Sequence, residues 1–166
     1  MGSVRSNIYV SLLLFLYGTY FVSAQKSIPT LSLSNMDGIE ININELSKEK
    51  VIIMNFWATW CEPCIKELTA LNENVSLIED ELNASLVSVS IDDSRTMSRI
   101  KPMMHGNSWK FDVVTDSNQD IKRMFNIIDI PHTLLIYQNK IVYESTGYLI
   151  GDEQVLFEKI KALNNK

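Results

Sequence analysis

The sequence has only two cysteines and two histidines among its 166 residues. So few cysteines exclude a scaffold held together by disulfides. The two cysteines and two histidines together nearly exclude a zinc site that needs several such ligands. Glycine (6) and proline (4) are also scarce, which excludes a linker-rich or collagen-like chain. Basic residues number 15 against 20 acidic ones, and the net charge of −5 argues against nucleic acid as a partner. With 46% hydrophobic residues, the chain is expected to form one globular domain.

The N-terminal segment is apolar and differs from the rest of the chain. Residues 1–24 carry a single charge near the start, followed by an apolar stretch over 8–17 and by small residues ending at Ala24. This order is typical of a secretory signal peptide, so we expect residues 1–24 to be removed and 25–166 to form the domain. An uncleaved membrane anchor stays open, because the uncharged stretch over 6–25 is just long enough to span a bilayer. Either interpretation predicts an exported domain, in the periplasm or another extracytoplasmic location.

The two cysteines, Cys61 and Cys64, are separated by only two residues. A disulfide that closes so small a loop removes little chain entropy from the unfolded state, so it stabilises the fold poorly. In an exported protein, this pair is better explained by redox chemistry than by structural cross-linking.

The rest of the chain alternates strand and helix patterns. An Asp-Gly between two alternating segments predicts a β-hairpin. The continuous apolar run 51–57 predicts a buried central strand. Apolar residues at helical spacing then predict a long helix from about residue 61 to Ile78. We expect the two hairpin strands at 31–33 and 39–43, and further strands at 86–91, 111–114, 130–137 and 141–147. Further helices are expected at about 95–105, at 119–125 and from Asp152. The apolar face of the last helix would carry Val155, Leu156, Ile160 and Leu163. Asp92-Asp93-Ser94 is expected to cap the helix at 95–105.

The position of the cysteines at the start of a helix has chemical consequences. Free N–H groups and the helix dipole favour negative charge there, which lowers the pKa of the Cys61 thiol and makes it a nucleophilic thiolate. Cys64 lies one turn further on, on the same side but deeper. It is placed to attack a mixed disulfide formed at Cys61 and release the product.

The segment Asn55-Phe56-Trp57-Ala58-Thr59-Trp60-Cys61-Glu62-Pro63-Cys64 resembles the active-site segment of thioredoxin-like proteins. Together with the hairpin, the inserted helix and the later Ile130-Pro131, it resembles the TlpA/ResA-like branch of exported thiol-disulfide oxidoreductases. The resemblance covers about residues 28–163. It implies an α/β fold, a thioredoxin-like three-layer α/β/α sandwich with an N-terminal β-hairpin and an inserted helix.

The resemblance also implies roles for residues around the motif. Cys61 would be the exposed attacking thiol and Cys64 the resolving thiol, so that the only redox group is their disulfide and no other cofactor or metal is needed. Trp60 would flank the substrate groove, while Glu62 and Pro63 would stiffen the first helical turn. All three are candidate substrate-binding residues.

A second segment would complete the groove. Pro131 resembles the cis-proline that lies opposite the cysteines in this family, and the backbone of Ile130 would pair with the substrate chain. His132 stands where the family usually has threonine. A histidine near Cys61 could titrate near neutral pH and stabilise the thiolate, or it could be an ordinary residue at the edge of the groove.

Glu67 is the candidate for proton transfer. It lies three residues after Cys64, on the helix face that also carries Cys61. A carboxylate beneath the cysteines would raise their pKa values or exchange protons with them. ResA-like proteins have a glutamate here, whereas thioredoxin uses an aspartate at the position of Asn55. The alternative is that Glu67 is an ordinary helix residue in an ion pair.

The expected function is the reduction of disulfides in other exported proteins, with apocytochrome c maturation as the substrate class that the resemblance suggests. A membrane electron donor would re-reduce the Cys61–Cys64 disulfide, and the domain is expected to act as a monomer. Four alternatives stay open: a disulfide oxidant or isomerase, a peroxidase, a zinc site completed by His105 and His132, and a non-catalytic binding module with a structural disulfide.

Overall fold

The computed structural model describes residues 26–165. The predicted signal peptide or anchor at 1–24 lies outside these residues. Within them, no helix combines the length and the apolar character that crossing a membrane requires.

A five-stranded sheet forms the centre of the domain, in the order β5-β4-β3-β6-β7. Strands β3 (Val51–Trp57), β4 (Ala84–Ser90) and β5 (Asp112–Thr115) are parallel. Strand β6 (His132–Tyr137) runs antiparallel to β3, and β7 (Lys140–Thr146) runs antiparallel to β6 and therefore in the direction of β3. Every residue of β3 is buried, because this middle strand is covered on both faces. The predicted buried strand over 51–57 is therefore confirmed.

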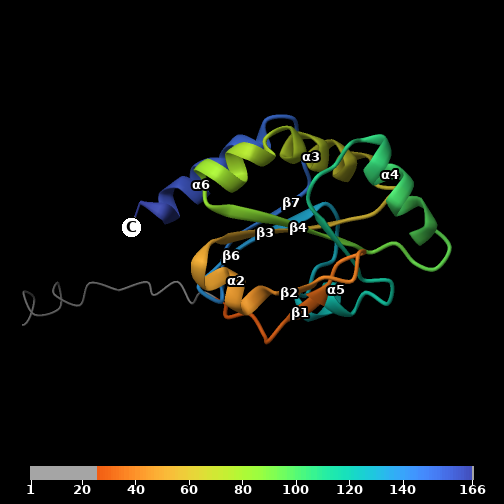
Figure 1. Ribbon diagram of the computed structural model, residues 1–166, viewed down its shortest axis with the longest axis horizontal. Coiled ribbons are helices and arrows are strands. Elements are labelled where there is room, and N and C mark those ends of the chain that lie inside the picture. The colour runs from red at the N-terminus through yellow and green to blue at the C-terminus, as the bar shows by residue number, and fades with distance from the viewer. Residues whose placement is uncertain (1–25, 166) are drawn as a thin grey trace, which may run out of the picture.

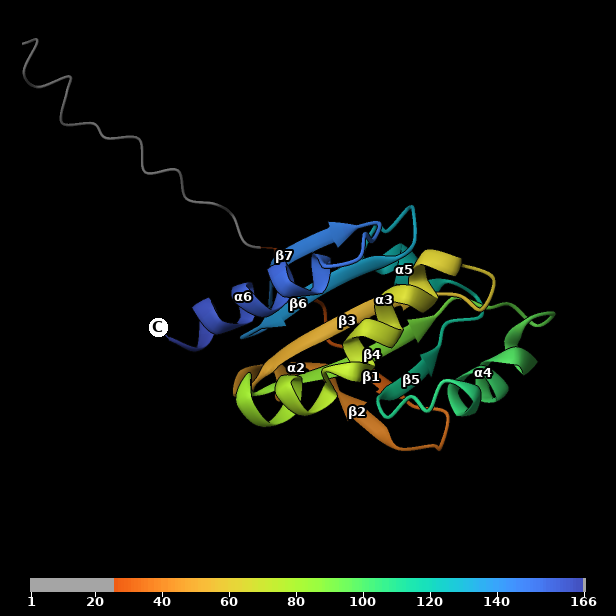
Figure 2. The ribbon, with the colours of Figure 1, turned by 90° about the horizontal axis from the view of Figure 1, so that it is seen from above.

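Helices cover both faces of the sheet, as Figures 1 and 2 show. One face carries α3 (Glu62–Glu73), α4 (Ile100–Gly106) and α6 (Asp152–Asn164). The other carries α2 (Ile43–Glu49), α5 (Asp120–Met124) and the hairpin of β1 (Ser32–Ser34) and β2 (Glu40–Asn42). This arrangement confirms the predicted three-layer sandwich with an N-terminal hairpin and a helix inserted between β4 and β5.

Several local predictions were wrong at the ends of elements. The residues after the hairpin form α2 instead of extending the strand to Ile43, because the Asn42 side chain accepts a hydrogen bond from the Glu45 N–H and caps a helix. The long helix expected to reach Ile78 ends at Glu73 and is followed by a short π-helix, η1 (Leu77–Glu81). On α6, Val155 is exposed, and Phe157 takes the buried position.

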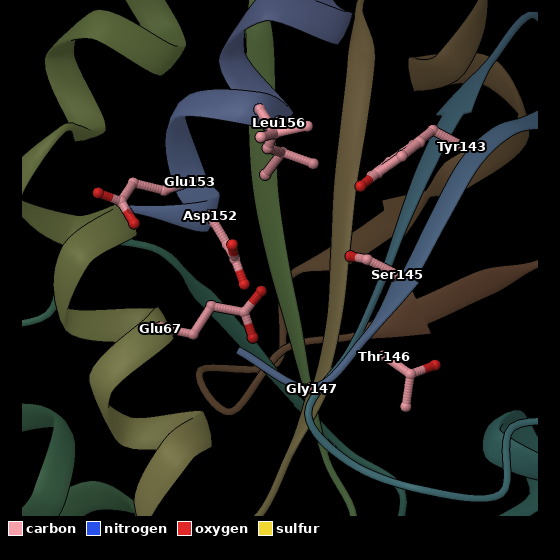
Figure 3. Close-up of a pocket in the computed structure, with 9 residues that line it drawn as sticks. Glu67, Tyr143, Ser145, Thr146, Gly147, Asp152, Glu153 and Leu156 are labelled. Carbon is pink, nitrogen blue, oxygen red and sulfur yellow. The ribbon is translucent and has the colours of Figure 1, made fainter. Parts of the chain in front are cut away.

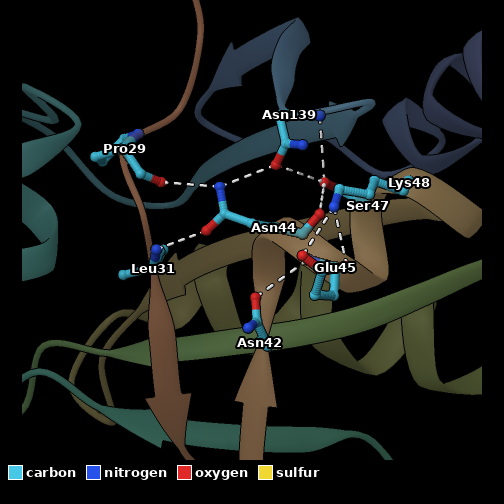
Figure 4. Close-up of polar contacts among 8 residues, drawn as sticks. All are labelled: Pro29, Leu31, Asn42, Asn44, Glu45, Ser47, Lys48 and Asn139. Carbon is cyan, nitrogen blue, oxygen red and sulfur yellow. Dashed lines mark hydrogen bonds and ion pairs between the residues drawn. The ribbon is translucent and has the colours of Figure 1, made fainter.

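The N-terminal region is held at the end of the sheet far from the cysteines (Figure 4). Asn44 donates to the Pro29 carbonyl and to Asn139 Oδ1, while its own Oδ1 accepts the Leu31 N–H at 2.7 Å. Asn139 belongs to the β6–β7 turn and also accepts the Ile28 N–H through its carbonyl. These bonds anchor the start of the hairpin and of α2 at the β6–β7 turn, while the hairpin tip bonds to β5 through the Met36 N–H and the Val113 carbonyl at 2.9 Å.

Candidate active site

The cysteines lie where the chain leaves the sheet and starts α3. The Cys61 N–H donates to the Ala58 carbonyl at 3.0 Å, which forms a tight turn after β3. Cys61 then caps the helix, because its Sγ accepts the Cys64 N–H at 3.3 Å, and Pro63 occupies the first turn, where its missing N–H costs nothing. The two cysteines form a disulfide with their Cα atoms 5.3 Å apart. Within residues 26–165, no group of three or more His, Cys, Asp or Glu side chains is arranged to hold a metal ion.

The two cysteines differ in depth, as predicted, but the attacking cysteine is less exposed than expected. Cys64 has no exposed surface and Cys61 keeps 6%. Cys61 is therefore a buried residue that keeps a small accessible area in the oxidised protein. The neighbouring Trp60 is 59% exposed and forms the outer wall of the site.

A buried aspartate holds the loop before the cysteines. Asp92 follows β4 and accepts hydrogen bonds from the Thr59 N–H (2.8 Å), the Thr59 hydroxyl (2.6 Å) and the Ser90 hydroxyl (2.7 Å). Of the segment Asp92-Asp93-Ser94 that was predicted to cap the next helix, Asp92 turns inward, while Asp93 accepts the Arg95 N–H at 2.9 Å. Neither residue caps α4, which begins at Ile100. Sequence reasoning missed the role of Asp92, although an acidic residue directly after a buried strand was an available signal.

The Ile130–Pro131 peptide is cis, as the resemblance implied. Pro131 is buried, and its carbonyl accepts the Gly147 N–H at 2.8 Å. The next residue, His132, pairs with Phe56 in β3. This register brings Pro131 to the end of β3, from which the cysteine loop departs.

His132 lies on the face of β6 opposite to that of its neighbour Thr133, because successive strand residues point to opposite faces of the sheet. Its Nδ1 lies 2.8 Å from the Thr146 hydroxyl on β7. Burial lowers the pKa of His132, although the nearby Glu144 acts to raise it. A lowered pKa leaves the imidazole neutral at pH 7, so the prediction that its positive charge would stabilise the Cys61 thiolate at neutral pH loses its basis.

Glu67 is buried in a hydrogen-bonded network beneath the cysteines, with 6% of its surface exposed. The Asn55 amide donates to Glu67 Oε2 at 3.0 Å and to the Thr133 hydroxyl at 2.8 Å, and that hydroxyl donates to Glu67 Oε1 at 2.7 Å. Asn55 and Thr133 are direct partners in the β3–β6 register. Thr133 was not predicted, because only the strand pairing brings it to Glu67.

Burial raises the pKa of Glu67 to about 7. The hydrogen bonds from Thr133 and Asn55 act in the opposite direction, and the negative charges of Asp152 and Glu153 add to the rise. The Glu67 carboxyl therefore changes its protonation near neutral pH, which suits proton exchange. The alternative of an ordinary ion-paired helix residue is wrong, because burial and the bonds to Asn55 and Thr133 define its surroundings.

A cavity of about 170 Å³ lies next to Glu67, between α3, β7 and the start of α6. Figure 3 shows the Glu67 and Asp152 carboxyl groups pointing towards each other, with the Ser145 and Tyr143 hydroxyls opposite them.

The remaining predicted residues lie at the surface of the first helical turn. Glu62 forms an ion pair with Lys66 at 2.8 Å, and the hydrogen bond from that lysine holds the pKa of Glu62 below its usual range. Pro63 is exposed beside it. Trp60, Glu62 and Pro63 are thus the exposed residues next to the cysteines in sequence, while Ile130 and Pro131 directly precede His132, the partner of Phe56 near the end of β3.

Comparison with known proteins agrees with this geometry. Residues 24–145 match the model of the AhpC/TSA family. The chain belongs to this family. It is 28% identical over 131 residues to the thiol-disulfide oxidoreductase ResA of Bacillus subtilis strain 168, covering 78% of this chain and 71% of the relative. It is 27% identical over 138 residues to ResA of Bacillus thuringiensis subsp. konkukian, covering 80% and 78%.

Solved structures give the same fold. The solution structure of a thioredoxin-like protein of Porphyromonas gingivalis has a TM-score of 0.68 at 37% identity, covering 84% of this chain and 93% of that one. The crystal structure of StoA from Bacillus subtilis has a TM-score of 0.66 at 22% identity, covering 78% and 96%. With the cysteine pair in place, the chain is a thioredoxin-like thiol-disulfide oxidoreductase.

Proposed function

We propose that the protein reduces disulfides in other exported proteins through the Cys61–Cys64 dithiol. The observation that carries this proposal is the arrangement at the start of α3, where Cys61 caps the helix and keeps the only accessible cysteine surface while Cys64 lies fully beneath it. Cys61 is therefore the attacking thiol and Cys64 the resolving thiol.

The proposed reaction has two exchanges. The Cys61 thiolate attacks a substrate disulfide, forms a mixed disulfide and releases the first substrate thiolate. Cys64 then loses its proton to the Glu67 carboxylate and attacks Cys61 Sγ. The Cys61–Cys64 disulfide forms, the second substrate thiolate leaves, and Glu67 holds one proton.

Apolar side chains around the cysteines support a polypeptide substrate. The carboxyl ends of β3 to β5, the start of β6 and the end of β7 lie at one end of the sheet. Exposed apolar side chains in the loops there are Trp60, Ile128, Leu149 and Ile150. Such a concentration of apolar surface suits an extended or unfolded protein segment better than a small polar disulfide. We include Ile130, Pro131 and His132 in this binding surface.

The sequence and the relatives support a proposal for the cellular setting. The N-terminal pattern at 1–24 supports export, and an oxidising compartment would require a membrane electron donor to re-reduce the disulfide. We propose apocytochrome c, whose thiols must be reduced before haem attachment, as the substrate class. Similarity to thiol-disulfide oxidoreductases named ResA supports this choice.

The test is reduction of insulin disulfides by the wild type, Cys61→Ser and Cys64→Ser. We expect Cys61→Ser to lose activity and Cys64→Ser to accumulate a mixed disulfide visible by mass spectrometry. Full activity in Cys61→Ser would refute the mechanism. The reduction potential of the Cys61–Cys64 pair tests direction, and a value well above that of glutathione would contradict a reductase.

A further inference from the structure

The reaction proposed above leaves a proton on a buried carboxyl. Glu67 is 6% exposed and its oxygens are held by Asn55 and Thr133. A bound polypeptide would cover the cysteine side of the site, where Trp60 forms the wall. The proton on Glu67 must therefore reach solvent by another path before the next turnover.

The cavity next to Glu67 provides such a path. It is lined by Glu67 on α3, by Tyr143, Ser145 and Gly147 on or next to β7, and by Asp152 and Leu156 on α6. Ser145 pairs with Thr133 across β6 and β7, so both face the side of the sheet on which Glu67 lies. The cysteine loop contributes no residue to this lining.

Asp152 is the group in this cavity best placed to carry a proton. Its side chain is exposed, and Figure 3 shows its carboxyl group directed at that of Glu67. Asp152 Oδ2 accepts the Leu149 N–H at 2.8 Å, a bond that orients the side chain and leaves Oδ1 available for a proton. Glu153 is less suitable, because its Oε2 already accepts from the Tyr148 hydroxyl (2.7 Å) and the Gly151 N–H (3.0 Å).

We propose that this cavity is the proton-exchange route of Glu67 and that Asp152 relays the proton between Glu67 and solvent. The inference rests on the proposed function. When Cys64 attacks, its S–H bond breaks and an O–H bond forms on Glu67. That O–H bond then breaks as the proton passes to Asp152 and on to water, and Glu67 returns to its carboxylate. No electron moves in this step. In the reverse direction, Asp152 delivers a proton to Glu67.

The charges facing Glu67 set the direction of the pH effect. Asp152 and Glu153 on α6 both raise the pKa of Glu67. Burial raises the pKa of Tyr148 to about 12. The phenol therefore keeps its proton, and its hydrogen bond to Glu153, at every pH near neutrality. Asn55 on β3 and Thr133 on β6 do not titrate, and Tyr143 lies on β7. On α3, Cys64 and Cys61 complete the titratable groups of the reduced protein.

The experiment is stopped-flow oxidation of the reduced full-length protein by a model peptide disulfide at saturating concentration, in dilute buffer. Asp152→Asn can keep the bond to Leu149 N–H through its amide oxygen but removes the charge. We expect the Asn variant to slow the step on the order of tenfold. We also expect the midpoint of its pH–rate profile to move to lower pH, because Glu67 loses a negative neighbour, and its rate to recover as imidazole is added. Asp152→Glu should retain the rate without imidazole.

Two further variants make the test specific. Ser145→Leu fills the cavity, and we expect a slow rate that imidazole does not restore. Glu158→Gln, an exposed change on the same helix, should behave as wild type. An unchanged pH midpoint in Asp152→Asn, together with a rate independent of imidazole, would overturn the relay. Loss of the pH dependence in Glu67→Gln would then still support the proposed reaction, so the two failures are distinguishable.

Discussion

The replacement of Glu67 by glutamine tests whether burial controls the ionisation of this carboxyl. In the folded protein its pKa is raised from 4.5 to about 7, with burial as the main cause. The folded state therefore holds the Glu67 proton more tightly than the unfolded state does. The contribution of Glu67 to stability should be largest below pH 4.5, where the carboxyl is protonated in both states, and should fall as the pH rises towards 7.

The magnitude follows from the size of that change. At about 1.4 kcal/mol per pKa unit, a rise from 4.5 to about 7 corresponds to a cost of about 3 kcal/mol above neutral pH. Glutamine cannot ionise, so the variant should not lose this stability above neutral pH. We expect the stability of Glu67→Gln relative to wild type to increase by about 3 kcal/mol between pH 4.5 and 8.

The measurement is urea unfolding of both oxidised proteins across that range. Keeping the disulfide intact prevents the cysteines from titrating. The difference between the two proteins is the informative quantity, because His132 has a lowered pKa and acts in the opposite direction, losing stability as the pH falls below its unfolded value. Glu73→Gln, an exposed change on the same helix, serves as control and should follow wild type. Parallel pH curves for wild type and Glu67→Gln would refute the reasoning.

Two further predictions concern the loop and the surface of the site. Asp92→Ala should lower the free energy of unfolding by about 3 kcal/mol, because it leaves the Thr59 N–H and two hydroxyls without their acceptor. Urea unfolding beside the exposed control Asp80→Ala checks this, and equal losses would contradict it. Trp60→Ala should change stability by less than about 0.5 kcal/mol, yet lower kcat/KM for insulin on the order of tenfold while sparing oxidised glutathione. Ile39→Ala, an exposed apolar change on the hairpin, is the control, and equal losses on both substrates would refute a role in polypeptide binding.

Local sequence patterns were sufficient to predict the centre of the fold. The apolar run 51–57 predicts a buried strand because a middle strand of a covered parallel sheet needs apolar residues on both faces. Helical spacing likewise predicted that Glu67 shares a face with Cys61 and Cys64. These predictions held because each depends on neighbours within one element.

The ends of elements were less predictable, because local signals compete there. The alternation that ends at Ile43 is typical of a strand, yet Asn42 and Glu45 also match a helix start. In the structure Asn42 caps a helix, and α2 begins at Ile43. At the other end of the chain, Val155 and Phe157 are both apolar, and only the way α6 packs on the sheet decides that Phe157 is buried and Val155 exposed.

The partners of the buried glutamate depend on pairing between distant segments, which a single sequence does not reveal. Asn55 precedes Glu67 by twelve positions and Thr133 follows it by 66. The β3–β6 register alone places both at its carboxyl group. Asp152 is further still along the chain and reaches the same cavity because α6 begins beside α3.

Because residue 55 is asparagine, Glu67 has no second carboxyl in its hydrogen-bonded network with Asn55 and Thr133. An aspartate there would place a second carboxyl against Glu67 in the same buried network, and the two would share their protons in coupled steps. Asn55 instead donates to Glu67 in its ionised form and cannot take up the proton itself. Glu67 is then the titrating group of this network, and its pKa is set mainly by burial, which raises it, and by two hydrogen bonds, which lower it. A single carboxyl with a pKa of about 7 matches a step in which Cys64 releases a single proton.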